Sequence, residues 1–525
     1  MGREELSQAS RDELIEHALA ARAELEATQA RLEAVEQQLR WLKQQLFGAR
    51  SERRLPPPDP LQLALGESLA SARSEPEAAG TPVRAHVRVA RPEPDKDERA
   101  GLRFDDTVPL RRIVVRDPAL AGLREGVDYT IVAEKKSYRL AQQPASYTVL
   151  EIVRPVVKLA RTGALSTPKA PASVLPGSYA DVSLLAGMLV DKLRYHLPLY
   201  RQHQRMTAAG ITLSRAALTS WVQRAGELLE PVYEAQLASI RRSRVVAMDE
   251  TPIRAGRKQG KPRKMKTGYF WPIYGDADEV AFPFAPTRAH AQVEVLLGDF
   301  KGTLVSDGFE AYARFRQKHD QVVHALCWAH ARRGFVKAED VEPGLAAQAL
   351  ERIRALYEVE HEIAARELEG SVKLALRATQ SQPIVVAFFA WLEEQLVAHA
   401  LLPTNPFTQA ARYALERRKG LEVFLSDPEV PLDTNHLERA LRPIPLGRKN
   451  WLFCWTELGA ERVGQLQSLI STCVLHDVDP YTYLVDVLQR IDTHPFSAVE
   501  QLTPRLWKQH FANQPLRSLL DVSPA

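Results

Sequence analysis

Residues 245–326 carry the pattern that most constrains the fold of this chain. Five short apolar runs typical of strands occur here, and two of them end directly in an aspartate. Three strands in series, followed by an alternation of strand and helix, indicate an α/β unit with a mixed sheet. The expected strands are 245–248, 268–274, 280–284, 302–306 and 322–326, with a helix at 290–297.

Asp249 and Asp307 directly follow two of these strands. Open α/β sheets place their sites at the carboxyl ends of strands, so both side chains are candidates for an active site. Carboxylates fixed there can hold two Mg²⁺ ions about 3.5–4 Å apart, which stabilise the attacking and leaving oxygens of phosphodiester chemistry. An aspartate at a strand end is also an everyday turn or cap residue, and for each one alone that alternative stays open.

A third candidate carboxylate is Glu438, in a segment where Asp433 or Thr434 can cap a helix. Glu438 would lie at the edge of that helix beside Arg442. It can complete a set of three carboxylates, or it can form a surface ion pair with Arg442 that is worth a few tenths of a kcal/mol. Spacing alone does not decide between these two interpretations.

Several blocks of the sequence resemble the transposases of the insertion sequence 66 family. In chain order they are LFGARSE at 46–52, MDET at 248–251, VSDG at 305–308, CWAHARR at 327–333, NHLERALRP at 435–443, GRKNWLF at 447–453 and VDPYTYL at 478–484. The resemblance implies an RNase H-like core whose DDE triad falls on Asp249, Asp307 and Glu438. It also includes Cys327 and His330, for which we expect a supporting role beside the active site.

The resemblance implies an enzyme, a DDE polynucleotidyl transferase that cuts DNA at the ends of a mobile element. The freed 3′-hydroxyl would then attack target DNA at the same site. The implied cofactors are two Mg²⁺ ions, for which Mn²⁺ can substitute, held by the three carboxylates. No covalent protein intermediate is needed, so we nominate no serine or tyrosine nucleophile. The alternatives are an RNase H-like nuclease that cuts without joining and a catalytically inactive DNA-binding relic or repressor.

Zinc is not expected, although family members often carry a cysteine-rich zinc module before the helix-turn-helix region. Residues 101–165 contain no cysteine, so a four-cysteine site is impossible there, and we expect a small β-rich module without zinc. His324, Cys327 and His330 also invite a zinc interpretation. They lack a fourth ligand, and a strand-to-helix junction buries such residues readily.

Residues 10–47 are expected to form one long helix. Ser10 and Glu13 have the spacing of a capping box, and neither Gly nor Pro interrupts the segment before Gly48. Apolar residues follow at heptad spacing, which favours a coiled coil and a homo-oligomer. A long amphipathic helix packed on its own domain is the alternative.

A helix-turn-helix is expected within residues 178–235, with a turn that begins at Gly210. Ser214 stands at the N-cap position of the second helix, which would present Arg215 and Gln223 to a DNA groove. Similar helix pairs also occur in α-rich domains that bind no DNA, so this signal is equivocal. The two expected helices span 198–209 and 214–229.

Cations cluster around the expected site. Seven lie within residues 254–266 without an acidic residue, and four more follow Glu438 closely. Such clusters suit contacts with DNA phosphates, although a solvated hairpin tip would explain some of the first one. Trp451 and Trp455 can stack on a base, but core packing is their expected use. The expected contacts are Arg257, Lys258, Lys261, Arg263, Lys264, Arg439, Arg442, Arg448 and Lys449.

Length and composition indicate the number of domains and the broad class of protein. A chain of 525 residues is too long for one ordinary domain, and 45% hydrophobic and 26% charged residues are normal for a globular protein. The formal net charge of +4 is only weak support for a polyanionic partner. Three cysteines are too few for a disulfide framework, and neither a signal peptide nor a membrane-spanning stretch is evident. We therefore expect a cytoplasmic protein without membrane contact.

The expected architecture is α+β and multidomain, with an RNase H-like mixed-sheet core that a helical insertion interrupts. Expected partners are DNA, as terminal inverted repeats and as target, a second copy of the chain, and small accessory proteins of the same element. The expected order is a coiled-coil helix at 1–54, a flexible linker at 55–100, the zinc-free β module at 101–165, the helix-turn-helix region at 178–235, the first part of the core at 240–336, the helical insertion at 337–430, the second part of the core at 431–475 and a C-terminal helical segment at 476–525.

Overall fold

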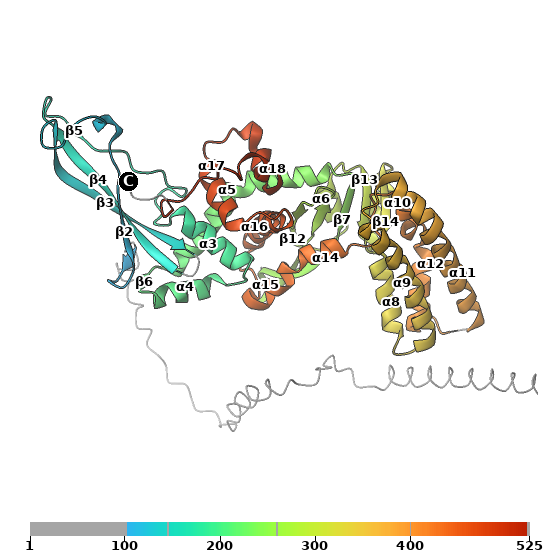
Figure 1. Ribbon diagram of the computed structural model, residues 1–525. Coiled ribbons are helices and arrows are strands. Elements are labelled where there is room, and N and C mark those ends of the chain that lie inside the picture. The colour runs from blue at the N-terminus through green and yellow to red at the C-terminus, as the bar shows by residue number, and fades with distance from the viewer. Residues whose placement is uncertain (1–101, 144–145, 259–260, 400, 522–525) are drawn as a thin grey trace, which may run out of the picture.

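The computed structural model describes residues 102–143, 146–258, 261–399 and 401–521. The predicted coiled-coil helix and linker lie outside these described residues. Within them the protein is mixed α+β, as the sequence predicted. It is elongated, with a β-rich arm at one end, a helical bundle at the other and a sheet between helices in the middle (Figure 1).

The arm is a sheet of long strands that projects from the body (Figure 1). β2 (Leu110–Val114) pairs in parallel with β4 (Ser146–Leu159), while β3 (Tyr129–Gln143) and the short β5 (Leu165–Ser166) pair with β4 in antiparallel fashion. The root of the sheet packs on α3 (Val182–Leu193), so this end of the arm belongs to the main hydrophobic core.

The next two helices lie where the sequence predicted a helix-turn-helix. α4 (Leu199–Ala208) is followed by β6 (Ile211–Thr212), which pairs with β1 (Arg103–Phe104), and then by α5 (Arg215–Arg241). Ser214 caps α5 by accepting the backbone N–H of Ala217 at 3.2 Å.

The prediction that the second helix ends at residue 229 is wrong, because α5 continues through Pro231 to Arg241. A proline inside a helix removes one backbone hydrogen bond and costs about 3 kcal/mol. The turns beyond it bury Val232, Tyr233 and Leu237, and α5 packs on α16 (Glu457–Leu475). Burial of that apolar face offsets the cost of the proline.

The central sheet has five strands in the order β11-β10-β7-β13-β14. β7 (Val245–Met248) pairs antiparallel with β10 (Ile273–Gly275) and parallel with β13 (Gly302–Ser306). β13 continues in parallel to β14 (Val322–Leu326), and β11 (Val280–Ala281) pairs with β10. The mixed sheet is as predicted, and β7, β13 and β14 have the predicted bounds.

Two predicted strands, 268–274 and 280–284, are each divided in the structure. β8 (Thr251–Lys258), β9 (Lys261–Phe270) and β12 (Phe284–Ala285) form a separate three-stranded sheet. Pro272 and Pro283 lie at the divisions, where a continuous strand would need amide hydrogens that proline lacks. The sequence prediction missed β8 because its arginines interrupt the apolar alternation. The resulting β8–β9 hairpin begins two residues after Asp249.

Helices cover both faces of the central sheet (Figure 1). Val246 and Met248 of β7 pack with α6 (Ala291–Leu297), α7 (Glu310–Lys318) and the end of α5. The alternate residues of β7, Val245 and Ala247, belong to the larger core on the other face. This alternation fixes the strand rigidly up to the residue that precedes Asp249.

A helical bundle separates β14 from the segment that carries Glu438. Aromatic side chains of three of its helices pack edge to face at the centre, including Phe335, Phe388 and Phe407. Its helices are α8 (Trp328–Ala338), α9 (Pro343–Ala365), α10 (Gly370–Leu376), α11 (Gln382–Ala398), α12 (Pro406–Glu416) and α13 (Arg418–Leu421). The chain then continues as α14 (Asn435–Leu441), α15 (Pro443–Trp451), α16, α17 (Pro480–Arg490) and α18 (Pro504–His510). No helix of the described segments is long and apolar enough to cross a membrane.

Arg377 ties the bundle to the segment that leads back to the site. Its side chain is fully buried and contacts both carboxylate oxygens of Glu360 at 2.8 Å. It also donates to the carbonyls of Phe424, Asp427 and Val430. One cation therefore satisfies an acidic side chain of α9 and three backbone acceptors just before α14.

Arg377→Ala is expected to lower the free energy of unfolding by about 2–4 kcal/mol, because half-buried Glu360 and three backbone carbonyls would lose their partner. Arg314→Ala removes an exposed pair with Glu310 and serves as the control, with a loss below about 0.5 kcal/mol. Urea unfolding followed by circular dichroism measures both. Equal, small losses for the two variants would contradict the role of Arg377.

Candidate active site

The ends of two adjacent strands and the start of one helix meet beside the central sheet. Asp249 and Asp307 follow the parallel strands β7 and β13, so their side chains start from the same edge. Glu438 lies in the first turn of α14, which reaches this edge after the helical bundle. The negative charges of Asp307 and Glu438 both act on Asp249. The three predicted carboxylates are thus brought into one neighbourhood.

Ligand atoms of Asp249, His330 and Glu438 all lie within 4.8 Å of one another. Asp307 is not part of this tight group. His330 sits in the first turn of α8, where its Nε2 lies 3.0 Å from Nη1 of Arg333 and its buried Nδ1 has no hydrogen-bond partner. A buried imidazole nitrogen without a partner, next to two carboxylates, is a donor set that fits a divalent cation.

Burial raises the pKa of Asp249 to about 7. The backbone N–H of Glu250 donates to this carboxylate at 2.7 Å and opposes the shift, whereas the charges of Glu250, Asp307 and Glu438 add to it. Burial also lowers the pKa of His330 and keeps its imidazole neutral, the form that can bind a metal. The site therefore concentrates negative charge that a bound cation would neutralise.

Glu250 is a fourth acidic residue that the sequence analysis passed over. Its side chain is only 4% exposed, forms an ion pair with Arg288 and accepts the Tyr312 hydroxyl at 2.8 Å. The guanidinium of Arg288 in turn lies 4.0 Å from the ring centre of Phe309, two residues after Asp307. Glu250 therefore holds the guanidinium of Arg288 beside Asp307. The one feature of the sequence that could have pointed to Glu250 is its position directly after Asp249.

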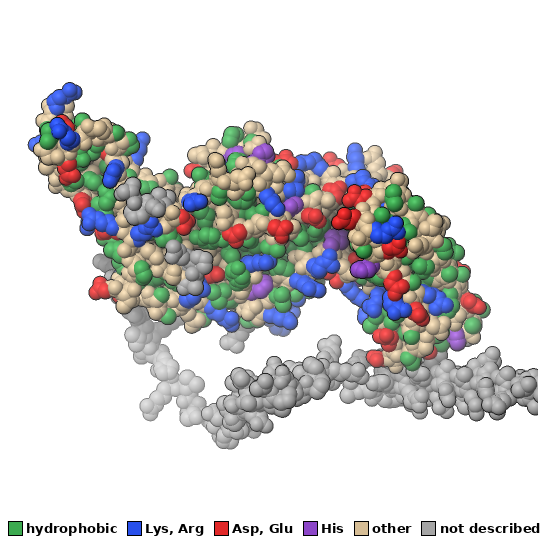
Figure 2. Space-filling model, in the orientation of Figure 1, with side chains coloured by type: hydrophobic (Ala, Val, Ile, Leu, Met, Phe, Trp, Pro, Cys, Tyr) green, Lys and Arg blue, Asp and Glu red, His purple; other side chains and the backbone are tan. Residues whose placement is uncertain are grey.

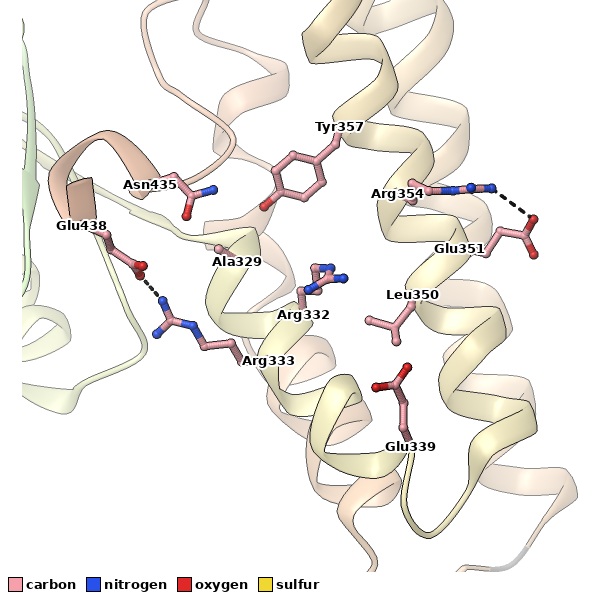
Figure 3. Close-up of a pocket in the computed structure, with 10 residues that line it drawn as sticks. All are labelled: Ala329, Arg332, Arg333, Glu339, Leu350, Glu351, Arg354, Tyr357, Asn435 and Glu438. Carbon is pink, nitrogen blue, oxygen red and sulfur yellow. Dashed lines mark hydrogen bonds and ion pairs between the residues drawn. The ribbon is translucent and has the colours of Figure 1, made fainter. Parts of the chain in front are cut away.

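Arg333 is a second residue that the sequence analysis did not single out. It forms an ion pair with Glu438, and Figure 3 shows the two side chains reaching toward each other from α8 and α14. A cavity of about 800 Å³ lies between α8, α9 and α14 and has Arg332 and Tyr357 in its lining. Figure 3 shows Glu438 at the edge of this cavity, so the carboxylate is open to solvent-borne ligands.

A second cavity, of about 500 Å³, adjoins Asp307 on the other side of α8. Three cations line it, Arg288, Arg333 and Lys337, together with Tyr413 of α12. Gly308 permits this close packing, because a Cβ at that position would lie 2.6 Å from the Tyr413 hydroxyl. The helical bundle thus forms one wall of a basic cavity beside Asp307.

Cys327 joins the two helices that carry His330 and Glu438. Its buried Sγ accepts hydrogen bonds from the backbone N–H and the hydroxyl of Thr434, both at 3.3 Å. Cys327 precedes α8 and Thr434 precedes α14, so this contact sets the spacing between the two helix starts. The ring of His324 instead bonds Ser306 at 2.8 Å. Neither Cys327 nor His324 belongs to the cation-binding group found among the described residues.

Most of the predicted DNA contacts whose side chains are described are exposed. Arg215 begins α5 and lies 5.8 Å from the ring centre of Tyr200, whereas Gln223 is half-buried. Arg448 donates to the carbonyl of Pro252 and so also has an internal partner. Exposed positions are Arg215, Arg257, Lys264, Arg439, Arg442 and Lys449, and the side chains of Lys258, Lys261 and Arg263 lie outside the described ones. Figure 2 shows Lys and Arg side chains along the edge where α14 and α15 lie.

An acidic site at the strand ends of a mixed sheet, beside basic surfaces, is what a DNA-processing enzyme requires, and the comparisons place the chain among the transposases. It belongs to the IS66 family. The model for "Transposase IS66 family" matches residues 177–462, which include Asp249, Asp307 and Glu438. The "IS66 C-terminal element" matches residues 468–505, and "Transposase C of IS166 homeodomain" matches residues 34–113. The resemblance that the sequence blocks indicated is confirmed.

Three proteins of Sinorhizobium fredii (strain NBRC 101917 / NGR234) are similar over most of their length. The protein y4hP is 31% identical over 497 residues, covering 88% of this chain and 87% of its own. The protein y4jD is 33% identical over 397 residues, covering 72% and 76%. The protein y4qI is 30% identical over 479 residues, covering 87% and 86%. The similarity therefore extends well beyond the segments around Asp249, Asp307 and Glu438.

In EDTA, Asp249→Asn is expected to stabilise the protein increasingly between pH 5.5 and pH 8. The folded-state pKa of about 7 lies above the unfolded value of about 3.9, so the wild type loses stability as the pH rises from about 4 to 7. An amide has no such dependence. The gain in the free energy of unfolding should reach on the order of 2–4 kcal/mol at pH 8.

Thermal melting at the two pH values tests this, with the exposed Asp320→Asn as the control. Mg²⁺ at pH 8 should raise the melting temperature of the wild type more than that of Asp249→Asn. If Asp249→Asn melts below the wild type at pH 8 in EDTA, the ionised carboxylate of Asp249 does not destabilise the folded protein, and its pKa is not raised.

Proposed function

We propose that this transposase cuts DNA at the ends of its element and joins the freed 3′ ends to target DNA, with Asp249, Asp307 and Glu438 as its catalytic triad. The approach of Asp249, His330 and Glu438 to within 4.8 Å carries the proposal. These residues come from three segments far apart in the sequence. A fold brings such ionisable groups together against their mutual repulsion at functional sites more often than elsewhere.

The arrangement of the sheet supports an RNase H-like core. Three antiparallel strands, β11, β10 and β7, are followed by the parallel pair β13 and β14. The first aspartate of the triad ends the central strand β7, and the second ends its parallel neighbour. The helical bundle is then an insertion into this core between the second and third carboxylates.

The oxygen-rich donor set supports Mg²⁺, with Mn²⁺ as a substitute that also accepts the imidazole of His330. When bound, two such ions would stabilise charge on the attacking and leaving oxygens of a phosphodiester. Arg288 and Lys337 in the cavity beside Asp307 would bind phosphates on either side of the scissile bond. Arg333 would leave Glu438 for DNA phosphate once the carboxylate engages a cation, since one guanidinium cannot fully serve both.

The remaining surfaces support a path for DNA across the body. The exposed first turn of α5 with Arg215 suits a groove, and the β8–β9 hairpin and α14–α15 carry the other predicted contacts. Two copies of the chain would act together, and small accessory proteins of the element would complete the assembly.

Strand transfer in vitro tests this function. Purified protein is mixed with labelled DNA carrying the ends of its element and with a plasmid target, in Mg²⁺ or in EDTA. The wild type should give joined product only with Mg²⁺. Asp307→Asn should lose at least about 1,000-fold in rate, which corresponds to about 4 kcal/mol of transition-state stabilisation. The exposed Asp320→Asn is the matched control and should retain wild-type activity.

Each rival activity gives a different result in the same assay. Cleavage without joining would indicate an RNase H-like nuclease. Specific DNA binding without either reaction, after the accessory proteins are added, would indicate an inactive relic or repressor. Activity in Asp307→Asn equal to that of the wild type would remove this carboxylate from the triad.

A further inference from the structure

Trp455 is exposed beside the β8–β9 hairpin, where the sequence predicted core packing. Its side chain is 63% exposed, although tryptophan is normally among the more buried residues. Trp451, by contrast, is half-buried and lies 5.7 Å from the ammonium group of Lys192. The core-packing prediction is therefore wrong for Trp455. An exposed ring of this size is a candidate contact surface for a ligand.

Backbone pairing holds the segment of Trp455 in place. Cys454 forms a parallel bridge with Ala255 of β8, in which its N–H donates to the Arg254 carbonyl at 2.8 Å and its carbonyl accepts from Gly256 at 3.1 Å. The ring of Phe453 packs edge-on against Trp455, with centroids 4.8 Å apart at 88°. The exposed ring is thus fixed in orientation before any partner arrives, which lowers the entropic cost of binding.

The surroundings of the ring are basic. The guanidinium of Arg257 lies 5.1 Å from the ring centre. Lys266 stands on the neighbouring strand and pairs with Glu457 at 2.7 Å. Arg257, Lys266 and the carboxylate of Glu457 line a shallow depression of about 630 Å³. Gly256, whose φ of +69° suits glycine, lines it too. The Trp455 side chain thus stays 63% exposed, with the Arg257 guanidinium over its ring and the Lys266–Glu457 ion pair at its border.

We propose that Trp455 is a stacking platform for an unpaired DNA base, with Arg257 and Lys266 as contacts to the adjoining phosphates. This proposal rests on the DNA-joining function proposed above and deepens it. Every base presents a π-face, so a fixed aromatic ring binds unpaired nucleotides of any sequence. Paired bases inside the duplex stack on one another on both sides, so in a fully paired end only the outermost pair has a free face. A ring bordered by cations that meet phosphate fits this ligand better than an apolar protein segment, which would bring no anion to Arg257 or Lys266.

The platform lies within reach of the catalytic carboxylates. Ala255, which pairs with the segment of Trp455, is six residues along the chain from Asp249. At about 3.3 Å per strand residue the backbones of Asp249 and Ala255 are at most about 20 Å apart, the length of about six base pairs. A strand that opens next to the scissile phosphate would place a base at this distance.

Equilibrium binding to two DNA ends in EDTA tests the proposal without requiring catalysis. One end is fully paired, and in the other the six outermost base pairs are replaced by unpaired strands of the same length. The wild type should prefer the unpaired end. Trp455→Ala should bind that end about 10-fold more weakly and the paired end less than 2-fold more weakly. Trp455→Phe, which keeps an aromatic face, should recover most of the loss.

Two controls separate stacking from general damage. Phe496→Ala removes another exposed aromatic side chain, 81% exposed and far along the chain, and should change neither affinity. Arg257→Ala should weaken both complexes and reduce the salt dependence, because it removes a phosphate contact. Circular dichroism melting establishes that Trp455→Ala is folded.

Equal loss on both DNA ends, or no preference of the wild type for the unpaired end, would overturn the platform while leaving the proposed transposition intact. The expected preference in a protein that never joins DNA would support the platform and overturn the joining reaction. A wild type that binds neither end would overturn both.

Discussion

The crowding of negative charge at the ends of β7 and β13 is the constraint on which the rest of the structure depends. Asp249, Glu250, Asp307 and Glu438 lie close enough for their charges to interact, and burial with this repulsion raises the pKa of Asp249 to about 7. Such a site can persist only if rigid elements hold it and cations stand nearby. Buried β7, the Arg288 pair of Glu250 and the Arg333 pair of Glu438 meet these needs. The same repulsion would favour a divalent cation at this site.

Contacts made by residues other than the carboxylates hold α14 beside the central sheet. Arg377 ties the helical bundle to the segment before α14, and the Cys327–Thr434 contact fixes the start of α14 against the start of α8. These contacts therefore hold Glu438 and His330 in a fixed position relative to each other and to the bundle. On its other side the bundle packs on Gly308 and closes the basic cavity beside Asp307. The helical bundle therefore positions residues of the candidate site and also lines its cavity.

The sequence predicted the strands that carry the aspartates because each is a short apolar run buried on both faces, a pattern that needs no tertiary information. The resemblance then selected Glu438, which helical spacing alone left undecided. What the sequence missed depends on contacts between distant residues. β8 is a strand because it pairs with β9, and its arginines conceal the alternation. The roles of Glu250 and Arg333 follow from partners 38 and 105 residues away. Trp455 is exposed because Cys454 pairs with β8, which no local pattern reveals.

The central claim is that the acidic cluster binds the divalent cations that act on DNA. Electron paramagnetic resonance of Mn²⁺, titrated into protein bound to an element end, counts the bound ions most directly. We expect tight Mn²⁺ binding to the wild type, with loss of bound ions in Asp249→Asn and in Glu438→Gln, and no change in Asp320→Asn. Wild-type protein without bound Mn²⁺, or variants that bind as much Mn²⁺ as the wild type, would contradict it.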